Sequence, residues 1–269
     1  ALSQASAPGS NSLQAAWQQA RQAGAYDYST TIVQTTWPLP RLENVGLSSS
    51  QQRIYLEGSA DLPAEALTMK LWTDGGNVST AQDAIEIKVE DGKAVGRVGH
   101  SDWREVDDMT GLFAPNQDLL TFLAAADNIR EIAEDEAQRP SRIRQYAFDV
   151  DGPALATYMR DQLEAELTRK GKLPAGVSLD VIPQYVGMTG QGELWVTADG
   201  FPLRQIMHLK FPPAHLEQVE VEITTDFSGW NEAMAQAGAQ SPALLGLISL
   251  PGWRLTPRDL ARSEERRVG

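Results

Sequence analysis

The sequence VEVEITTDF at residues 219–227 alternates between two sets of side chains, one mostly apolar and one polar. In an extended strand, successive side chains point to opposite faces, so this pattern places one face against a core and the other in water. Burial on one side only is typical of antiparallel sheets, whose second face stays solvated. Residues 219–227 therefore predict a strand of an antiparallel sheet with one covered face.

The same alternation recurs along the chain between turn residues. Another predicted strand starts at residue 26 and ends at Trp37-Pro38-Leu39-Pro40, because proline cannot donate to a strand ladder. The remaining predicted strands are residues 53–60, 66–73, 85–90, 94–100, 144–150, 193–197 and 202–211. Asp91-Gly92 joins two of them as a hairpin, and Asp199-Gly200 marks another turn. Because helical patterns fall between runs of strands, the order predicts an α+β fold with antiparallel pairing rather than repeated strand–helix–strand units.

Three segments have the features of helices. Asn11 or Ser12 caps a helix that stops at Gly24, and a short apolar helix is expected over residues 118–126. The longest helix is expected at about residues 153–170, where apolar side chains recur every four positions. These helices supply apolar stripes that can cover the apolar face of the sheet.

Composition narrows the classes of function. The 269 residues carry a net charge of −13, which argues against nucleic acid or an anionic membrane as an electrostatic partner. The chain has no cysteine, so disulfides, thiolate nucleophiles and cysteine-ligated metals are excluded. The longest apolar run, residues 243–250, is far too short to span a bilayer, so no transmembrane segment is expected.

No pattern typical of an enzyme is present in the sequence. His100, His208 and His215 lack the spacing of metal ligands, and each is expected on the surface. There is no G-x-S-x-G motif, phosphate loop or dinucleotide-binding fingerprint. We therefore predict a protein that is not an enzyme and uses no metal or cofactor.

Apolar side chains remain as candidates for a functional site. They can simply form the core between helices and sheet, or they can line an apolar cavity for a lipid chain where helices leave part of the sheet uncovered. In the second interpretation, the ligand-binding side chains are Trp17, Met69, Leu71, Phe122, Leu123, Leu155, Met159 and Leu163.

Several motifs resemble the lipoprotein-localisation superfamily that includes LolA, LppX and LprG. They are DGK at 91–93, WREV at 103–106, LFAP at 112–115 leading into LLTFL at 119–123, RQYAFDV at 144–150 and GELWVTADGFPLR at 192–204. The resemblance covers about residues 12–227. It implies an open half-barrel, in which about three helices cover the concave face of a strongly curved antiparallel sheet. The implied apolar cavity takes acyl chains of lipoproteins or glycolipids in the bacterial envelope.

From this resemblance we expect residues 11–229 to form a LolA-like half-barrel that binds or carries the acyl chain of a lipid or lipoprotein. Its expected location is periplasmic or otherwise extracytoplasmic. The alternative is the same fold with a filled core, serving as an interaction or sensor module of a larger exported protein, with an envelope protein as its partner.

The two ends of the chain are expected to lie outside this domain. Residues 1–10 are rich in Ala, Ser, Gly and Pro, so we expect them to be disordered. Residues 230–269 are expected to be a C-terminal extension or linker. The charged tail at 262–269 matches no upstream pattern and is expected to be an artefact.

Overall fold

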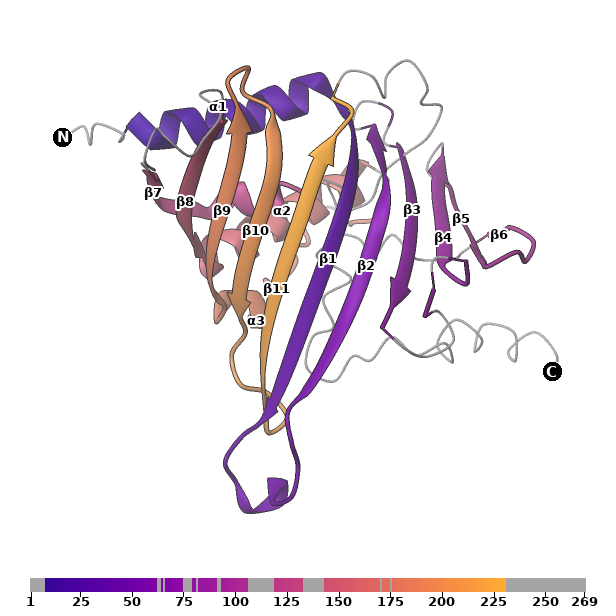
Figure 1. The fold of residues 1–269 in the computed structure, drawn as a ribbon, viewed down its shortest axis with the longest axis vertical. Coiled ribbons are helices and arrows are strands. Elements are labelled where there is room, and N and C mark those ends of the chain that lie inside the picture. Colours follow the sequence, from indigo (N-terminus) through magenta and orange to yellow (C-terminus); the bar gives the residue numbers. More distant parts are fainter. Residues whose placement is uncertain are drawn as a thin grey trace.

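The fold is an open, eleven-stranded antiparallel sheet with helices on one face (Figure 1). It is seen in a computed structural model that describes residues 8–61, 64, 66–74, 79–80, 82–90, 93–105, 119–132, 143–169, 171–174 and 176–230. The strand order is β6-β5-β4-β3-β2-β1-β11-β10-β9-β8-β7. The predicted α+β class with antiparallel pairing is confirmed.

Two meanders meet at the first and last strands. The first runs outward through β1 (Ala25–Pro38), β2 (Ser50–Asp61), β3 (Ala66–Thr73), β4 (Ile85–Glu90), β5 (Lys93–Val98) and β6 (Arg104–Glu105). The second runs inward through β7 (Ala126–Glu131), β8 (Ile143–Asp151), β9 (Thr189–Thr197), β10 (Pro202–Lys210) and β11 (Glu217–Ser228). Because β11 pairs with β1, the two meanders form one continuous sheet whose edges are β6 and β7.

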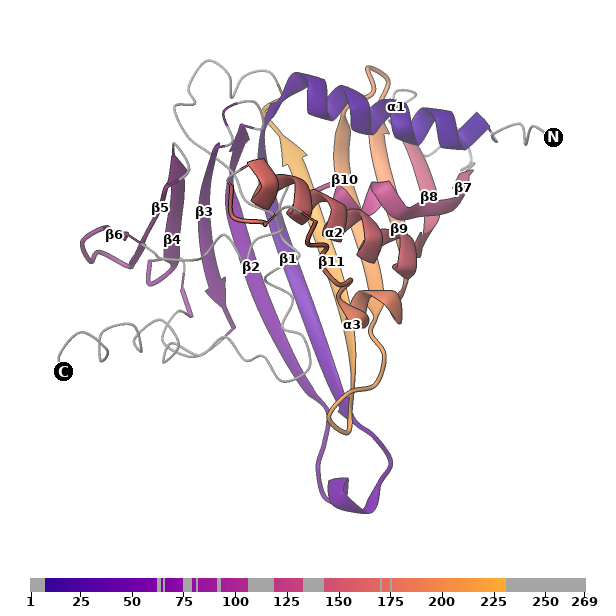
Figure 2. The same cartoon turned by 180° about the vertical axis from the view of Figure 1, so that it is seen from behind.

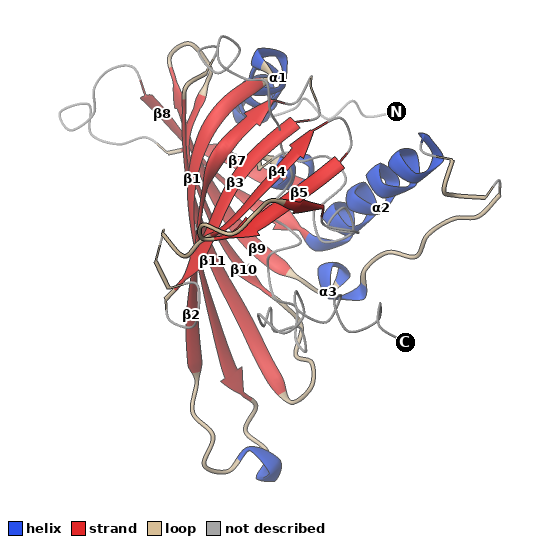
Figure 3. Ribbon diagram, turned by 90° about the vertical axis from the view of Figure 1, so that its right-hand side faces the viewer, coloured by secondary structure: helices blue, strands red, loops and turns tan. Residues whose placement is uncertain are grey.

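The two long helices lie on the concave side of this sheet (Figures 2 and 3). Helix α1 (Pro8–Ala23) crosses one end of the sheet and packs on β1, β7 and β10. Helix α2 (Gly152–Arg169) follows β8 and runs diagonally across the face toward β1 and β2 (Figure 2). The four-residue helix α3 (Pro183–Val186) packs beside α2. No described helix is both long and apolar enough to cross a membrane.

The alternation at residues 219–227 places side chains as predicted. Every second residue of β11 from Val219 to Phe227 is buried on the concave side, and none of these five is more than 4% exposed. The residues between them are exposed or half-buried on the other face. The hydrophobic effect of this one-sided burial holds the helices on the sheet.

The short apolar helix expected over residues 118–126 takes a different form. Residues Thr121–Ala125 make a 3-10 helix, η3, and the chain continues directly into β7. Helix α1 begins at Pro8, before the predicted cap and inside the segment expected to be disordered. Strand β1 ends at Pro38, inside the proline-containing run at residues 37–40 that is predicted to end it, and β11 pairs with it as far as Glu217.

Trp230 belongs to the folded body, although the sequence places it at the start of the C-terminal extension. Its indole Nε1 donates to the Pro202 carbonyl oxygen at 2.8 Å, and its ring stacks on Phe201 and packs on Tyr26. These contacts attach the end of β11 to the β9–β10 turn. Residues 231–269, the rest of the predicted extension, lie outside the described residues.

The chain that returns from α2 is held along that helix by Glu164. Its carboxylate accepts hydrogen bonds from the Leu179 backbone N–H and the Ser178 hydroxyl. These hydrogen bonds stabilise the ionised carboxylate and lower the pKa of Glu164. The helix and its return segment therefore stay together on the concave side.

Candidate functional site

The concave face of the sheet is the candidate site, because it gathers nearly all the apolar side chains chosen from the sequence. Six of the eight belong to one contiguous buried cluster: Met69, Leu71, Phe122, Leu123, Leu155 and Met159. Trp17 is half-buried and packs at the margin of this cluster. Leu163 is half-buried on α2, toward the end of the helix that reaches β1 and β2.

These residues fall into two groups on the face. Phe122 and Leu123 in η3 lie with Leu155 in the part of the molecule where η3 contacts α1, α2 and β8. Met69 and Leu71 lie on β3, beyond the central strands. The described helices pack most closely on β1, β7, β8 and β10, so the β3 group lies in the half of the face with less helical cover.

A polar row that the sequence did not predict as a site crosses the centre of this apolar face. Thr30 on β1, Thr225 on β11 and Gln205 on β10 are direct neighbours in the strand register. All three are buried, at no more than 2% exposure. The Thr30 and Thr225 hydroxyls hydrogen-bond to each other at 3.0 Å. The concave face is therefore apolar on both sides of a central polar row.

Gln205 is the unusual member of the row. Its side-chain Oε1 is buried and has no hydrogen-bond partner among the described residues. A buried polar atom without a partner costs about 1–3 kcal/mol of stability, and most such atoms in proteins are satisfied. Gln205 Oε1 is therefore an acceptor available to a hydrogen-bond donor that reaches the concave face.

The register extends the polar row into apolar side chains in both directions. On one side Gln205 pairs with Leu194, which pairs with Tyr146. On the other side Thr30 pairs with Leu56, which in turn pairs with Leu71. One predicted site residue, Leu71, thus lies on the same line across the sheet as the polar row.

Tyr28 and Gly58 shape the face next to Met69. Tyr28 on β1 lies opposite Gly58 on β2, which lies opposite Met69 on β3. Because Gly58 has no side chain, the Tyr28 ring passes over it, and its hydroxyl donates to the Thr68 carbonyl oxygen at 3.5 Å. Burial raises the pKa of Tyr28, so its hydroxyl stays protonated and able to donate.

The opposite face of the sheet is polar and has two open hollows. One, of about 220 Å³, is lined by Glu57, Thr68, Lys70, Glu86, Lys88 and Trp103, together with Gly58, Met69 and Ile87. The other, of about 460 Å³, is lined by residues of β8, β9 and β10 that include Asp149, Gln191 and His208.

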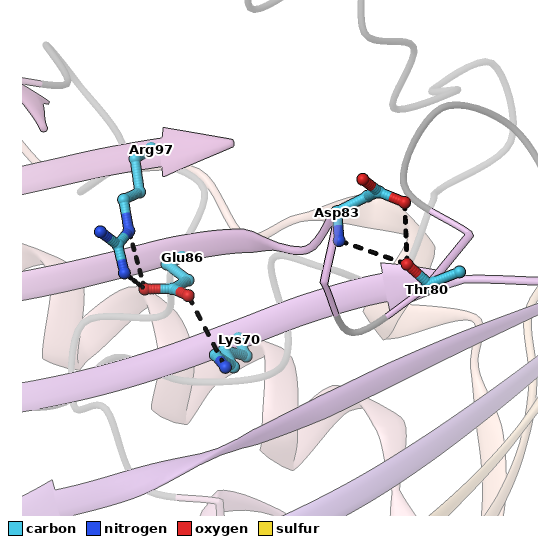
Figure 4. A network of polar contacts seen from close by, with 5 residues as sticks. All are labelled: Lys70, Thr80, Asp83, Glu86 and Arg97. Carbon is cyan, nitrogen blue, oxygen red and sulfur yellow. Dashed lines mark hydrogen bonds and ion pairs between the residues drawn. The ribbon is translucent and has the colours of Figure 1, made fainter. Parts of the chain in front are cut away.

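Glu86 in the first hollow is already paired with basic side chains. Glu86 accepts hydrogen bonds from Arg97 at 2.6 and 2.9 Å, and Lys70 Nζ lies 3.6 Å from it (Figure 4). Trp103 lies under Lys88 and Arg97, with the cations 4.7 and 4.6 Å from the ring centroid. These contacts stabilise the β3–β5 surface and occupy the Glu86 carboxylate.

The three histidines lie where the sequence placed them. His100 and His208 are exposed, and His215 has a positive φ of 50° in the β10–β11 turn. His208 Nδ1 lies 3.7 Å from the Glu222 carboxylate on the polar face. Among the described residues, no three His, Asp or Glu side chains gather in a way that could hold a metal ion.

Comparison with known proteins gives only distant likenesses. No protein-family model and no curated protein matches the sequence. A DUF1329 family protein from Desulfovibrio piger is 11% identical, with a TM-score of 0.27 over 86% of this chain and 99% of that one. A beta-barrel-like protein of domain of unknown function DUF1849 from Brucella abortus is 11% identical, with a TM-score of 0.23 over 75% of this chain and 98% of that one. Neither likeness is close enough to assign a family or a function.

Proposed function

We propose that this protein is a non-enzymatic lipid-binding protein of the bacterial envelope, which binds or carries the acyl chain of a lipid or lipoprotein. The observation that carries the proposal is the concave face, where a buried polar row divides an otherwise continuous apolar surface. A ligand with a hydrocarbon chain and a polar group matches this face, because the chain can lie on the apolar surface while the polar group meets the polar row. The matching location is extracytoplasmic, in the periplasm or at the cell surface.

The acyl chain would lie over β3 and its neighbours. Met69 and Leu71 face the concave side there, and no described helix packs as closely on β3 as α2 packs on β8. Leu163 is half-buried in the second half of α2, the helix that crosses the concave face toward β1 and β2. A chain inserted between α2 and β3 would contact apolar side chains from both.

The energy available from such burial is large enough for tight binding. Each buried CH₂ group contributes about 0.8 kcal/mol, so ten of them give about 8 kcal/mol before the cost of association. An affinity near 1 μM needs about 8.2 kcal/mol net, so with an association cost of at least about 4 kcal/mol the chain needs about 15 or more buried CH₂ groups. No catalytic group is required for this function.

Enlarging a side chain under the proposed acyl chain is the direct test. We expect Met69→Trp to lower the affinity for a fluorescent fatty acid about tenfold, because the larger ring takes the place of the acyl chain. Thermal stability is expected to change little, since the ring replaces ligand contacts. Lipid extracted from the purified protein and identified by mass spectrometry should fall in parallel.

Lys70→Trp is the matched control for this experiment. Position 70 is next to Met69 on β3 but faces the polar side, where the exposed Lys70 ammonium lies 3.6 Å from the half-buried Glu86 carboxylate, which also has a shorter ion pair with Arg97. Exposed ion pairs contribute about 1 kcal/mol or less, so this variant should fold and bind as the parent does. Purified protein without lipid and without fatty-acid binding would contradict the proposal.

The polar row gives a second prediction about the ligand. Gln205→Met removes the buried acceptor and keeps the length of the side chain. We expect the ligand-free protein to become more stable by about 1 kcal/mol, because an unpaired polar atom is removed. A monoacylglycerol, whose hydroxyls can donate to Gln205, should bind about tenfold more weakly, while a fatty-acid methyl ester should be unaffected. If Gln205→Met changed the affinity for both ligands equally, Gln205 would not be the group that binds the polar part of the ligand.

An interaction or sensor module with a filled core is the second candidate. It is favoured by the deep burial of six of the eight selected side chains in one cluster, with exposures of 0% for Leu155 to 8% for Met159. In that case Met69→Trp would overpack the core and destabilise the protein by about 1–3 kcal/mol. The two functions therefore predict different results for Met69→Trp in the same unfolding experiment: little change in stability for the lipid-binding protein and a clear loss for the filled core.

A further inference from the structure

The hairpin between β1 and β2 projects beyond the rest of the molecule (Figures 1 and 2). The last residue pair of the two strands is Thr36 with Ser50. We call residues 39–49 the β1–β2 tip; it contains the one-turn 3-10 helix η1 (Leu42–Asn44). The tip lies at the end of the molecule opposite to α1 and the β9–β10 turn.

Hydrogen bonds give the β1–β2 tip a defined shape. The Asn44 side-chain amide donates to the carbonyl oxygens of Leu39 and Leu216, each at 2.8 Å. The Leu39 N–H also donates to the Leu216 oxygen at 2.8 Å. Leu216 belongs to the β10–β11 turn, so two neighbouring turns are held together at the base of the tip. Within the tip, the Leu47 N–H donates to the Asn44 oxygen at 3.0 Å.

The side chains that this shape presents to solvent are large and apolar. Leu42 is 89% exposed, Val45 is 79% exposed and Leu47 is 62% exposed. No other large hydrophobic residue of the described chain is as exposed as Leu42 or Val45. Apolar groups gathered at one exposed place are unfavourable in water and commonly mark an interaction site.

The neck of the hairpin adds an aromatic ring behind this apolar end. Trp37, close to the end of β1, is 38% exposed. Tryptophan is enriched where a protein crosses the boundary between hydrocarbon and lipid headgroups, because its ring is amphipathic. The β1–β2 tip therefore has three aliphatic side chains at its end and a tryptophan behind them. This order matches a membrane surface, where aliphatic groups enter the hydrocarbon and tryptophan stays at the level of the headgroups.

Size and charge both favour a lipid surface over a protein partner. A stable protein interface takes about 800 Å² and 20–30 residues from each partner, far more than a narrow tip with three apolar side chains can offer. Within residues 39–49 the only charged side chains are Arg41 and Glu43, which balance. With a net charge of −13 on the whole chain, attraction to anionic lipid is also excluded as the driving force.

We propose that the β1–β2 tip docks this protein on an electrically neutral lipid surface by inserting Leu42, Val45 and Leu47. The binding is hydrophobic, weak and reversible, as expected for so small an inserted area. It orients the long axis of the sheet toward the membrane.

A single fluorophore can report this insertion, because the chain has no cysteine of its own. Val45→Cys labelled with an environment-sensitive dye should show blue-shifted emission when phosphatidylcholine vesicles are added to the full chain. Ala198→Cys is the matched control, since Ala198 is exposed in the β9–β10 turn at the opposite end. Its dye should not respond.

Vesicle sedimentation tests the side chains themselves. The triple variant Leu42→Ser, Val45→Ser, Leu47→Ser should partition onto phosphatidylcholine about tenfold less than the parent, because its apolar contacts are lost. Its unfolding should be unchanged, since the three side chains are exposed in the folded protein.

Three results would overturn the proposal. They are a silent dye at position 45, vesicle binding that requires anionic lipid, and a concentration-dependent dimer that the triple variant abolishes, which would make a second copy the partner of the tip. The proposal does not depend on acyl-chain binding. The affinity of the triple variant for fatty acid, measured in detergent-free solution, tests the two proposals separately. We expect it to equal that of the parent, because Met69 pairs with Gly58 and the tip begins beyond Ser50 at the other end of β2.

Discussion

Replacing Gly58 with alanine is expected to destabilise the protein by about 3–5 kcal/mol, the largest effect we predict for any single methyl group. A Cβ at position 58 would collide with the Thr68 carbonyl oxygen of the neighbouring strand and lie 2.8 Å from the Tyr28 hydroxyl. A backbone oxygen cannot move aside unless β2 and β3 separate. Because domains have about 5–15 kcal/mol of stability in total, denaturant unfolding should show a large loss.

Gly46→Ala separates crowding from backbone strain. Gly46 has a φ of 87°, and nothing lies within 4 Å of the position that a Cβ would take. Alanine there costs only the strain of a left-handed conformation, about 1–2 kcal/mol. If Gly58→Ala costs no more than Gly46→Ala, the close approach of Tyr28, Gly58 and Thr68 does not exist in solution.

Leu155→Ala is expected to destabilise the protein by about 2–5 kcal/mol. Leu155 is 0% exposed on α2, inside the cluster that also contains Phe122 and Leu123. Truncation there removes apolar contacts and leaves a cavity that the helix and sheet can close only in part. Chemical or thermal unfolding, with the helical circular-dichroism signal as the probe, measures the loss.

Leu163→Ala is the comparison on the same helix. The sequence puts Leu155 and Leu163 on one apolar stripe, but Leu163 is only half-buried. We expect this variant to lose about 1 kcal/mol or less, because little apolar area leaves water there when the protein folds. If Leu163 borders the acyl chain, fatty-acid affinity should fall while stability is retained. Equal destabilisation by both variants would mean that the far end of α2 packs as tightly as its start.

Strand periodicity is why so much of the fold could be predicted. The strict alternation at residues 219–227 fits a strand and does not fit a helix, and the structure has β11 over Glu217–Ser228. Strand β7 could not be found in this way. Its sequence ADNIRE is mostly exposed, its register with β8 is interrupted, and Asn128 has a positive φ of 48°. Such a strand is held by its neighbour's backbone and leaves no periodic signal.

Helix α3 was missed because four residues are too few for a helical period. Pro183 at its start is the only local signal, and its buried residue Tyr185 packs edge-on against Phe211 at 5.9 Å between ring centroids. The segment at 118–126 was assigned the wrong helix type for a related reason. Its apolar residues fit either an α-helix or a 3-10 helix over so short a length.

The apolar part of the candidate site could be chosen from the sequence, but its polar row could not. Thr30 and Thr225 each appear as a single polar residue on the apolar face of an alternating strand, which is a weak signal when each strand is read alone. Their meaning comes from register, because pairing brings them and Gln205 into one row. The exposed apolar tip was equally hidden, since a leucine in a loop sequence does not reveal whether it faces solvent.

The position of β1 at the centre of the sheet has a consequence for how the chain is made. Tyr28 pairs with Gly58 soon after both leave the ribosome, but its other neighbour, Phe227, is translated only after β2 to β10. Until then the nascent chain presents an unpaired backbone edge in what becomes the middle of the fold, and such edges recruit other chains. The two meanders join through pairing between residues very distant in sequence, which slows folding. This protein is therefore expected to need an unfolded-chain chaperone, and to refold in good yield only at low concentration.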